Sequence, residues 1–401
     1  MKRTTGSTLP FYGVILLWGF GSGLLLPVLP LYARSLGFSI EEWGLLVTVY
    51  AASTFIFEWM WGALSDRVDR RTFIAAGLLS GAALTYLYTL EAFTPFLYAL
   101  QFVRGATFIM VGPAVKALVS DLNSGGIGLS MGLYSSVRRL GSVVGPIVGT
   151  LIAEAWSYES ALHVYAAVYL VGALMTAMIP KVVTPSRVEG EASSILEDSK
   201  ALFAIRPILV LFAIPVIVYM GRTVIGSYLP IYAQEIVGMS TVGVGFLFSV
   251  GNIAGLLTTP VFGWLSDRHG RASVALTCFL LSMVAMFGIS LAGSPLQLTL
   301  SLVFFTMCFS PLTPLLLAML TDATPGRLLG TSMGIYSTFE NLGIVLTSPI
   351  YSLIWTSYAP SAIFVFGALT QVLGILLLLN TRKRARCKFA WKKGANSHKR
   401  A

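Results

Sequence analysis

The chain has 401 residues, of which 56% are hydrophobic and 11% are charged, and its mean hydropathy is +0.79. One water-soluble core cannot bury that much apolar surface, so the composition excludes an ordinary soluble protein and predicts a membrane protein. The net charge of +10 and the pI near 9.6 would suit a nucleic-acid partner, but the excess lies mainly in predicted loops and the tail, as membrane topology and a lipid surface require.

Apolar stretches long enough to cross a hydrocarbon core of roughly 30 Å as helices can be read twelve times. They cover residues 10–34, 43–63, 72–91, 94–119, 128–153 and 160–180, then 207–234, 242–263, 272–292, 295–319, 329–356 and 361–380. The predicted fold is an all-α membrane protein with twelve transmembrane helices in two six-helix bundles. These bundles are residues 1–180 and 207–380, with a polar cytoplasmic linker at 181–206 and a basic cytoplasmic tail at 381–401.

The two bundles carry matching sequences roughly 200 residues apart. GALSDRVDRR begins at Gly62 and GWLSDRHGR at Gly263, while LPLYA begins at Leu29 and LPIYA at Leu229. This spacing is too long for short solenoid repeats and is typical of parallel repeats of six spans. We therefore expect the functional site to lie between two related halves.

Basic residues predict which ends of the helices face the cytoplasm. If both termini lie inside, the predicted inner loops collect nearly all loop arginines and lysines, and the outer loops hold only Arg34. The stretch before the first span lacks a small-residue cleavage site, so we expect an uncleaved first helix. The sequence predicts a multi-pass protein of the plasma membrane with both termini inside.

The cysteines and histidines do not form a redox or metal-binding pattern. Cys278 and Cys308 fall within spans and Cys387 in the tail, so no pair suits an extracellular disulfide. The histidines fall at span edges or outside the membrane. Since the sequence also lacks a phosphate-binding loop and a catalytic triad, we expect neither an enzyme nor a bound cofactor, with the proton as the coupling ion.

These motifs resemble those of the major facilitator superfamily, and the resemblance covers essentially the whole chain. GALSDRVDRR is similar to the family's loop signature between the second and third helices, and GWLSDRHGR is similar to its weaker second copy. Gly141, Gly145, Pro146 and Gly149 are similar to the glycine and proline motif of the family's antiporters and drug exporters. The resemblance, closest to the twelve-helix drug/proton antiporter group, implies pseudo-symmetric bundles and alternating access.

The resemblance also implies a conformational latch at the cytoplasmic ends of the helices. In the family, the loop aspartate is thought to lock the closed cytoplasmic side, and that role falls here on Asp66, which could meet the positive end of a helix dipole. The predicted latch residues are Gly62, Asp66, Arg67, Arg71 and Asp121, and in the second half Asp267, Arg268, Arg271 and Asp322. These charges could instead serve topology alone, although that rule does not demand a carboxylate inside a basic loop.

The glycine and proline motif has two physical interpretations. Gly141, Gly145 and Gly149 lie four residues apart on one helical face and leave room for a neighbouring backbone. Pro146 removes a backbone hydrogen bond and can bend the helix. Close packing and a functional hinge would both explain the pattern.

Six ionisable residues lie well inside the predicted spans, where a charge costs at least about 2.5 kcal/mol and usually marks a pathway or an internal pair. They are Arg104, Arg138, Arg139, Arg222, Glu58 and Glu340. Arg138 and Glu340 are repeat partners near the expected midplane, each about eleven residues into its helix. The surplus of arginines would suit an anionic substrate. Alternatively, Arg222 pairs with Glu340, and Arg138 or Arg139 snorkels or bonds to backbone carbonyls.

Arg104 lies in a frame similar to a motif on the family's fourth helix, with the arginine and the glutamine exchanged. Gln101 takes the arginine's usual place, and Gly105 and Pro113 complete the frame. Three residues are nearly one helical turn, so Arg104 can still reach the same face. This exchange leaves open whether Arg104 takes part in proton coupling.

The predicted proton site is Glu340, with Glu58 as the second choice. Burial favours the protonated form of a carboxyl group, and a nearby arginine favours the ionised form, so proton occupancy can respond to substrate and conformation. The first helix carries no acid, although many exporters of the family have one there.

Aromatic and amide residues on the inner helices are candidates for the cavity lining, although each is individually more often structural. They are Trp18, Phe20, Tyr219, Tyr232, Tyr336, Asn252 and Asn341.

The leading functional prediction is secondary active transport of a small organic solute, with export by antiport with protons. Proton-coupled uptake of an organic metabolite, an anionic one included, is the first alternative, and a non-transporting receptor or lipid-handling protein is the second. The expected partners are the solute and membrane lipid, without nucleic acid, and nothing requires more than a monomer. The tail could bind a partner or lie on anionic lipid.

Overall fold

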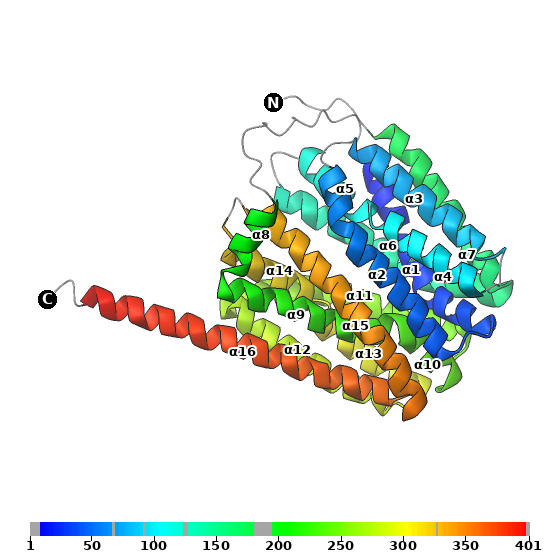
Figure 1. The fold of residues 1–401 in the computed structure, drawn as a ribbon. Coiled ribbons are helices and arrows are strands. Elements are labelled where there is room, and N and C mark those ends of the chain that lie inside the picture. The colour runs from blue at the N-terminus through cyan, green and yellow to red at the C-terminus, as the bar shows by residue number, and fades with distance from the viewer. Residues whose placement is uncertain are drawn as a thin grey trace.

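The computed structural model describes residues 9–65, 69–90, 94–122, 127–179, 195–325 and 328–397. Within these ranges the regular structure is entirely helical, without any strand. The helices lie side by side in one bundle, and the end of the last helix extends beyond it (Figure 1). The all-helical prediction is confirmed.

The first half contains seven α-helices and one short 3-10 turn within the described residues. They are α1 (Leu9–Ser35), α2 (Ile40–Ser65), α3 (Arg70–Leu87), α4 (Thr94–Phe108), α5 (Val111–Leu122), α6 (Ile127–Ala155), α7 (Tyr158–Met175) and η1 (Thr176–Met178).

The second half repeats this order after an additional helix, α8 (Ile195–Phe203), which lies inside the predicted polar linker. Its elements are α9 (Arg206–Thr223), the π-helical turn η2 (Val224–Tyr228), α10 (Leu229–Glu235), α11 (Thr241–His269), α12 (Arg271–Ser290), α13 (Pro295–Phe309), α14 (Leu312–Ala323), α15 (Leu329–Ser357) and α16 (Ala362–Ser397).

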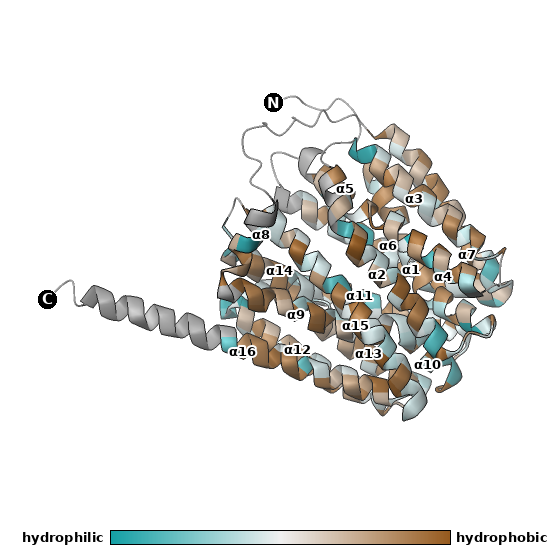
Figure 2. Cartoon of the chain, in the orientation of Figure 1, coloured by the Kyte–Doolittle hydropathy of each residue, from teal (hydrophilic) through white to brown (hydrophobic). Residues whose placement is uncertain are grey.

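Length and hydropathy identify a protein that crosses the membrane several times. Nine helices in the described ranges are long and apolar enough to span a bilayer. Figure 2 shows hydrophobic residues along the outer helices, for example on α12 and on α16 before its grey end. The prediction of a multi-pass integral membrane protein is confirmed.

Two predicted spans are each broken into a pair of helices. A turn separates α4 from α5 between Phe108 and Val111, and another separates α13 from α14 between Phe309 and Leu312. A proline follows each break, Pro113 in α5 and Pro314 in α14, and neither can donate the backbone hydrogen bond that would continue the preceding helix. Similarly, η2 precedes Pro230, where the missing donor favours a wider turn.

Helix packing defines which elements meet the other half. Helix α2 packs against α15, α6 packs against α11, and α1 packs against η2 and α10. Within the halves, α1 packs against α6 and α9 packs against α15. Helix α3 packs on α4 and α7, and α12 packs on α13 and α16. Three helices with intramembrane charges, α2, α6 and α15, therefore lie at the interface between halves.

Candidate functional site

Charged residues from both halves act on one another at the interface. Arg138 and Arg139 lie on α6, Arg222 lies on α9 and Glu340 lies on α15. The charged groups that act on Arg139 are Arg222 and Arg138, and Glu340 interacts electrostatically with Arg222. We call these four residues the central cluster. It brings the predicted repeat partners into one region, although no direct contact joins Arg138 to Glu340 within the described part of the chain.

Each arginine of the central cluster has a different surrounding. The guanidinium of Arg138 lies 4.2 Å from the ring centroid of Trp18, and its buried Nε has no hydrogen-bond partner in the described structure. Arg139 Nη1 donates to Thr259 Oγ1 at 2.8 Å and to the Gly255 carbonyl at 3.3 Å, both on α11 of the other half. Arg139 thus satisfies part of the alternative interpretation, in which an arginine bonds to a backbone carbonyl.

Arg222 and Glu340 meet around a tyrosine. Arg222 Nη1 donates to the Tyr219 hydroxyl at 3.2 Å, and its guanidinium lies 5.2 Å from the centroid of the same ring. Tyr219 interacts electrostatically with Glu340, Arg222 and also Arg138. Tyr219 therefore marks the place where the arginines of the two halves approach each other.

A second polar group joins α2 to α15 beside the central cluster. Asn341 Nδ2 donates to Glu58 Oε2 at 2.7 Å, and Thr54 Oγ1 donates to Asn341 Oδ1 at 3.1 Å. Lys116 on α5 interacts electrostatically with both Glu58 and Glu340. Both intramembrane carboxylates therefore face the interface between halves.

The accessibility of these residues indicates which way they face. Arg138, Glu58 and Glu340 are half-buried and Arg222 is exposed. Glu58 and Glu340 have polar or electrostatic partners in both halves, which indicates that these two side chains lie at the interface. Such a position suits a polar solute that passes between the halves.

Arg104 does not join the central cluster. It is 6% exposed and donates to Gln101 Oε1 at 3.2 Å, and its guanidinium lies 5.3 Å from the centroid of the Tyr50 ring. Tyr88 donates to the same glutamine oxygen. The exchanged residues Gln101 and Arg104 thus form one buried network inside the first half.

The glycine motif packs α6 against α1. A Cβ on Gly141 would lie 2.4 Å from the carbonyl oxygen of Leu16, and a Cβ on Gly145 would lie 2.3 Å from that of Phe20. At Gly149 it would meet Leu24 Cγ at 2.7 Å. These distances leave no room for a larger side chain, so close packing accounts for all three glycines.

Pro146 lies where α6 meets α11. The Pro146 carbonyl would be 2.7 Å from a Cβ on Gly245, and Thr150 Oγ1 would be 1.8 Å from it. Asn252 Nδ2, also on α11, donates to the Ser142 carbonyl at 2.9 Å. Asn252 therefore holds the two halves together at the backbone of α6.

The predicted lining tyrosines lie in different environments. Tyr232 is buried in the second half, with its ring 4.9 Å from Phe364 and 6.2 Å from Trp355, centroid to centroid. Tyr336 is buried and interacts electrostatically with Glu340. Tyr336 and Tyr219 therefore belong to the surroundings of the central cluster, and Tyr232 does not.

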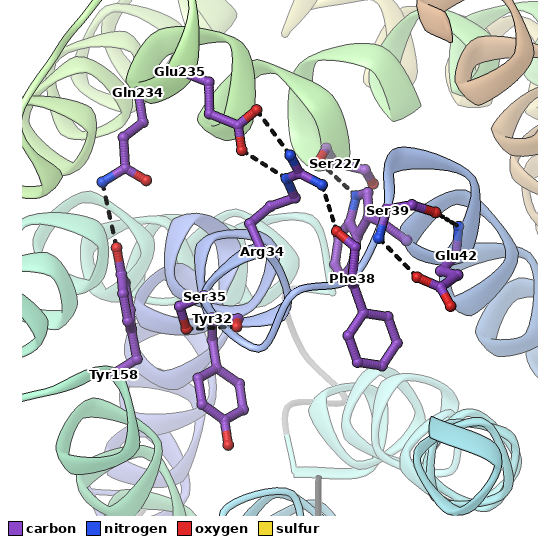
Figure 3. A network of polar contacts seen from close by, with 11 residues as sticks. Tyr32, Arg34, Ser35, Phe38, Ser39, Glu42, Tyr158, Ser227, Gln234 and Glu235 are labelled. Atoms are coloured by element: carbon purple, nitrogen blue, oxygen red, sulfur yellow. Dashed lines mark hydrogen bonds and ion pairs between the residues drawn. The ribbon is translucent and has the colours of Figure 1, made fainter. Parts of the chain in front are cut away.

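The two halves are bonded to each other at one end of the bundle, which we call the Arg34 end. Arg34 Nε donates to Glu235 Oε1 at 2.6 Å and Nη2 donates to Oε2 at 3.2 Å (Figure 3). Arg34 lies in the last turn of α1 and Glu235 is the last residue of α10, so this two-pronged ion pair joins the corresponding helices of the repeat. Arg34 also donates to the Phe38 carbonyl, which fixes the side chain in its direction.

Further bonds cross between the halves at the Arg34 end. Trp43 Nε1 donates to the Ser227 carbonyl at 2.9 Å, and Ser348 Oγ donates to the Gly44 carbonyl at 2.9 Å. The amide of Val242 donates to Glu154 Oε2 at 2.7 Å. The start of α2 is held for these contacts by a capping box, in which Ser39 and Glu42 bond to each other's backbone amides (Figure 3).

The opposite end carries the loop signatures, and we call it the basic end. Arg71 pairs with Asp69 at 2.6 Å and donates to the Ile179 carbonyl at 2.9 Å. The hydrogen bond to Asp69 raises the pKa of Arg71 and so keeps this loop side chain charged.

The second-half latch residues also have partners near them in sequence or within their own half. Arg271 pairs with Asp322 and donates to the Ala318 carbonyl at 2.7 Å, and the guanidinium of Arg268 lies 4.0 Å from the Trp264 ring centroid. Asp267 lies next to Arg268 in the last turn of α11. In both halves, the described latch contacts stay within one half.

Part of the predicted latch lies outside the described residues. This applies to Asp66 and Arg67, and to the side-chain surroundings of Gly62 in α2 and of Asp121 in α5. The proposed action of Asp66 therefore stays a prediction, as does the pairing of the loop arginines with Asp121.

Two residues around the charged groups were not predicted as site residues. Lys116 acts on both intramembrane carboxylates, and Thr54 orients Asn341. Lys116 had a sequence signal, since it is a lysine within the 94–119 span, but it falls close to the predicted inner boundary. Thr54 is ordinary in sequence and becomes distinctive only through its partner.

The sequence is similar to known membrane proteins over nearly its whole length. The sequence model of the Major Facilitator Superfamily matches residues 11–251 and residues 211–396. The multidrug resistance protein MdtG of Citrobacter koseri is 24% identical over 378 residues, covering 92% of this chain and 93% of the relative. MdtG of Klebsiella pneumoniae is 23% identical over 363 residues, covering 88% and 87%.

Solved structures share the fold. A mutant of the nucleoside transporter NupG matches with a TM-score of 0.81 and 13% identity, over 93% of this chain and 99% of that chain. A bacterial homolog of the human lysosomal transporter Spinster, in an inward-facing and unoccupied conformation, matches with a TM-score of 0.75 and 12% identity, over 93% and 94%.

Proposed function

The chain belongs to the major facilitator superfamily, and from this membership we propose that it is a secondary active transporter that exports a small organic solute in exchange for protons. The observation that carries the proposal is the central cluster, in which charges of both halves act on one another and the side chains are half-buried or exposed. Export is favoured because the relatives MdtG are named multidrug resistance proteins.

The proposal includes twelve membrane spans with both termini in the cytoplasm. The nine apolar spans are supplemented by α3, α6 and α15, which pack beside them and have 18, 29 and 29 residues. The loop arginines at the basic end favour a cytoplasmic position for that end under the positive-inside rule. The described bonds between halves include those of the Arg34 end, and the described latch contacts stay within each half, which supports a state that is open toward the cytoplasm.

Glu340 is the proposed proton carrier, and Glu58 is the second choice. Glu340 lies among Arg222, Lys116, Tyr219 and Glu58, so its charge state is sensitive to any movement or binding that alters those neighbours. Glu58 is held by Asn341, which makes it the less adjustable of the two carboxylates.

Proteoliposomes test this proposal directly. We expect Glu340→Gln to abolish transport driven by a pH gradient while leaving solute exchange without a gradient, because an amide cannot carry the proton. Glu58→Gln is the matched control and should retain at least part of the coupling. Full pH-driven transport in Glu340→Gln would refute the assignment, and an absence of solute flux in the wild type would favour a receptor or lipid-handling protein.

Proton-coupled uptake of an organic anion is the second candidate. The central cluster favours it, because this cluster contains three arginines and one carboxylate, and the surplus of positive charge would attract an anion. Accumulation assays in cells separate the two candidates, since export lowers the cellular content of a fluorescent dye, whereas uptake supports growth on a limiting metabolite.

A further inference from the structure

The central cluster contains an uncompensated concentration of positive charge. Arg139 is acted on by two like charges, Arg222 and Arg138. Guanidinium groups stay charged and like charges repel, so an anionic group among these arginines would lower the repulsion.

The neighbouring groups do not neutralise all three arginines. Arg139 is bound to uncharged oxygens on α11, and Arg222 shares Tyr219 and the field of Glu340. Arg138 has the face of Trp18 and a buried Nε without a partner in the described structure. Arg138 therefore has donor capacity left for a ligand.

Arg138 and Arg222 belong to different halves yet act on the same tyrosine, Tyr219. Arg222 donates to the hydroxyl of this tyrosine, so a charge of each half lies near the same side chain. Planar forks of this kind bind a carboxylate or phosphate through paired hydrogen bonds. An anionic group between them would bond to both halves at once.

We propose that the transported solute carries an anionic group, held between Arg138 and Arg222, and an apolar or aromatic body beside Trp18 and Tyr219. The inference rests on the proposed transport function and adds the substrate class to it. An anionic lipid headgroup has the same chemistry, but Arg138 lies about 16 Å along α6 from its basic end, at a rise of about 1.5 Å per residue, which is too deep for a headgroup. A free solute therefore fits the position better.

Three probes with one aromatic body and different charge test the inference. They are 2-naphthoate, 2-naphthalenemethanol and 2-naphthylmethylamine, titrated against the full-length protein in phosphatidylcholine nanodiscs by isothermal titration calorimetry. We expect naphthoate to bind at least about tenfold more tightly than the alcohol, and the amine to bind most weakly, as one charge-assisted hydrogen-bonded pair predicts. Equal binding of the three probes, or a preference for the amine, would overturn the inference.

Variants locate the anion site. Arg138→Gln and Arg222→Gln should each reduce the preference for naphthoate by about tenfold or more, while Arg138→Lys should retain part of it. Lys200→Gln removes an exposed positive charge from α8 and serves as the control that should keep the full preference. A full preference in both glutamine variants would refute the assignment.

Glu340→Gln should increase naphthoate affinity, whereas a folding defect would decrease it. Removal of the carboxylate beside Arg222 should increase naphthoate affinity by about tenfold, whereas a purely structural role would lower it or leave it unchanged. Phosphatidylglycerol in the nanodiscs should leave naphthoate binding unchanged, and strong competition would assign the site to lipid instead.

Flux measurements separate this inference from the proposed function. If the protein drives dye transport but shows no preference for naphthoate, the anion assignment fails and the transporter stands. If naphthoate binds through Arg138 and Arg222 but no solute is transported, the site stands and the proposed function fails.

Discussion

The Arg34 end and the basic end of the bundle use similar residues for opposite purposes. At the Arg34 end, an arginine pairs with a glutamate of the other half, whereas at the basic end Arg71 and Arg271 pair with aspartates of their own halves. The first arrangement holds the halves together, and the second stabilises each half separately. Of these described ion pairs, only the one at the Arg34 end therefore links the two halves.

Substitution of Gly245, which packs against α6, is expected to have the largest effect on closure of the Arg34 end. A Cβ on Gly245 would lie 1.8 Å from Thr150 Oγ1 and 2.7 Å from the Pro146 carbonyl, so Gly245→Leu cannot be accommodated with the halves closed. We expect the Arg34 end to open and transport to be lost. Spin labels at the exposed positions Trp156 and Leu291, one in each half, would report the opening as a longer label-to-label distance in electron paramagnetic resonance.

A matched control for this prediction lies on the same helix. Gly263 on α11 has open space around its Cβ position, so Gly263→Leu should leave the label distance unchanged. An unchanged distance in Gly245→Leu, with the fold retained, would mean that the α6–α11 contact does not set the closure.

Charge reversal of the ion pair at the Arg34 end has an intermediate expected effect. Arg34→Glu places two carboxylates opposite each other, and because both side chains are partly exposed the shift should be about 1 kcal/mol, or roughly fivefold in the population of the open state. The combination of Arg34→Glu with Glu235→Arg should restore the closed distance. A double variant as open as the single one would contradict a direct role of the pair.

Loss of the corresponding pair at the basic end should have the smallest effect on closure. Arg271→Ala removes bonds to Asp322 and to the Ala318 carbonyl, which are both on α14 of the same half. We expect a stability loss of no more than about 1 kcal/mol, measured as a slightly lower Tm, and an unchanged label distance at the Arg34 end. A clear opening there would show that the two ends are coupled through the second half.

Much of the fold could be predicted because hydropathy and helix length are strong signals in a membrane protein. The first span was predicted at 10–34 and α1 covers Leu9–Ser35. The breaks after Phe108 and Phe309 were not predicted, because a proline in a membrane helix can bend it or interrupt it, and packing decides between these outcomes. Helix α8 was missed because its polar composition is common to linkers and short surface helices.

The candidate site was predictable in its charges but not in its pairing. Arg138 and Glu340 could be identified because intramembrane charges are rare and these two occupy matching repeat positions. Sequence alone did not distinguish Arg139, which bonds across to α11, from Arg138, whose Nε is unpartnered, since they are neighbours in the chain. The place of Arg104 in a separate network likewise depends on tertiary contacts with Tyr50 and Tyr88.

The π-helical turn at Val224–Tyr228 gives the closed end a mechanical property. Trp43 of the first half donates its indole hydrogen bond to the carbonyl of Ser227, which lies within this wider turn. A rewinding of the turn to ordinary α-helical pitch would rotate that oxygen and, because an α-helix rises more per residue than a π-helix, move the helix that follows further along its axis. The pitch of this turn in the second half and the hydrogen bond from the Trp43 indole of the first half are therefore coupled, so that a change in one alters the other.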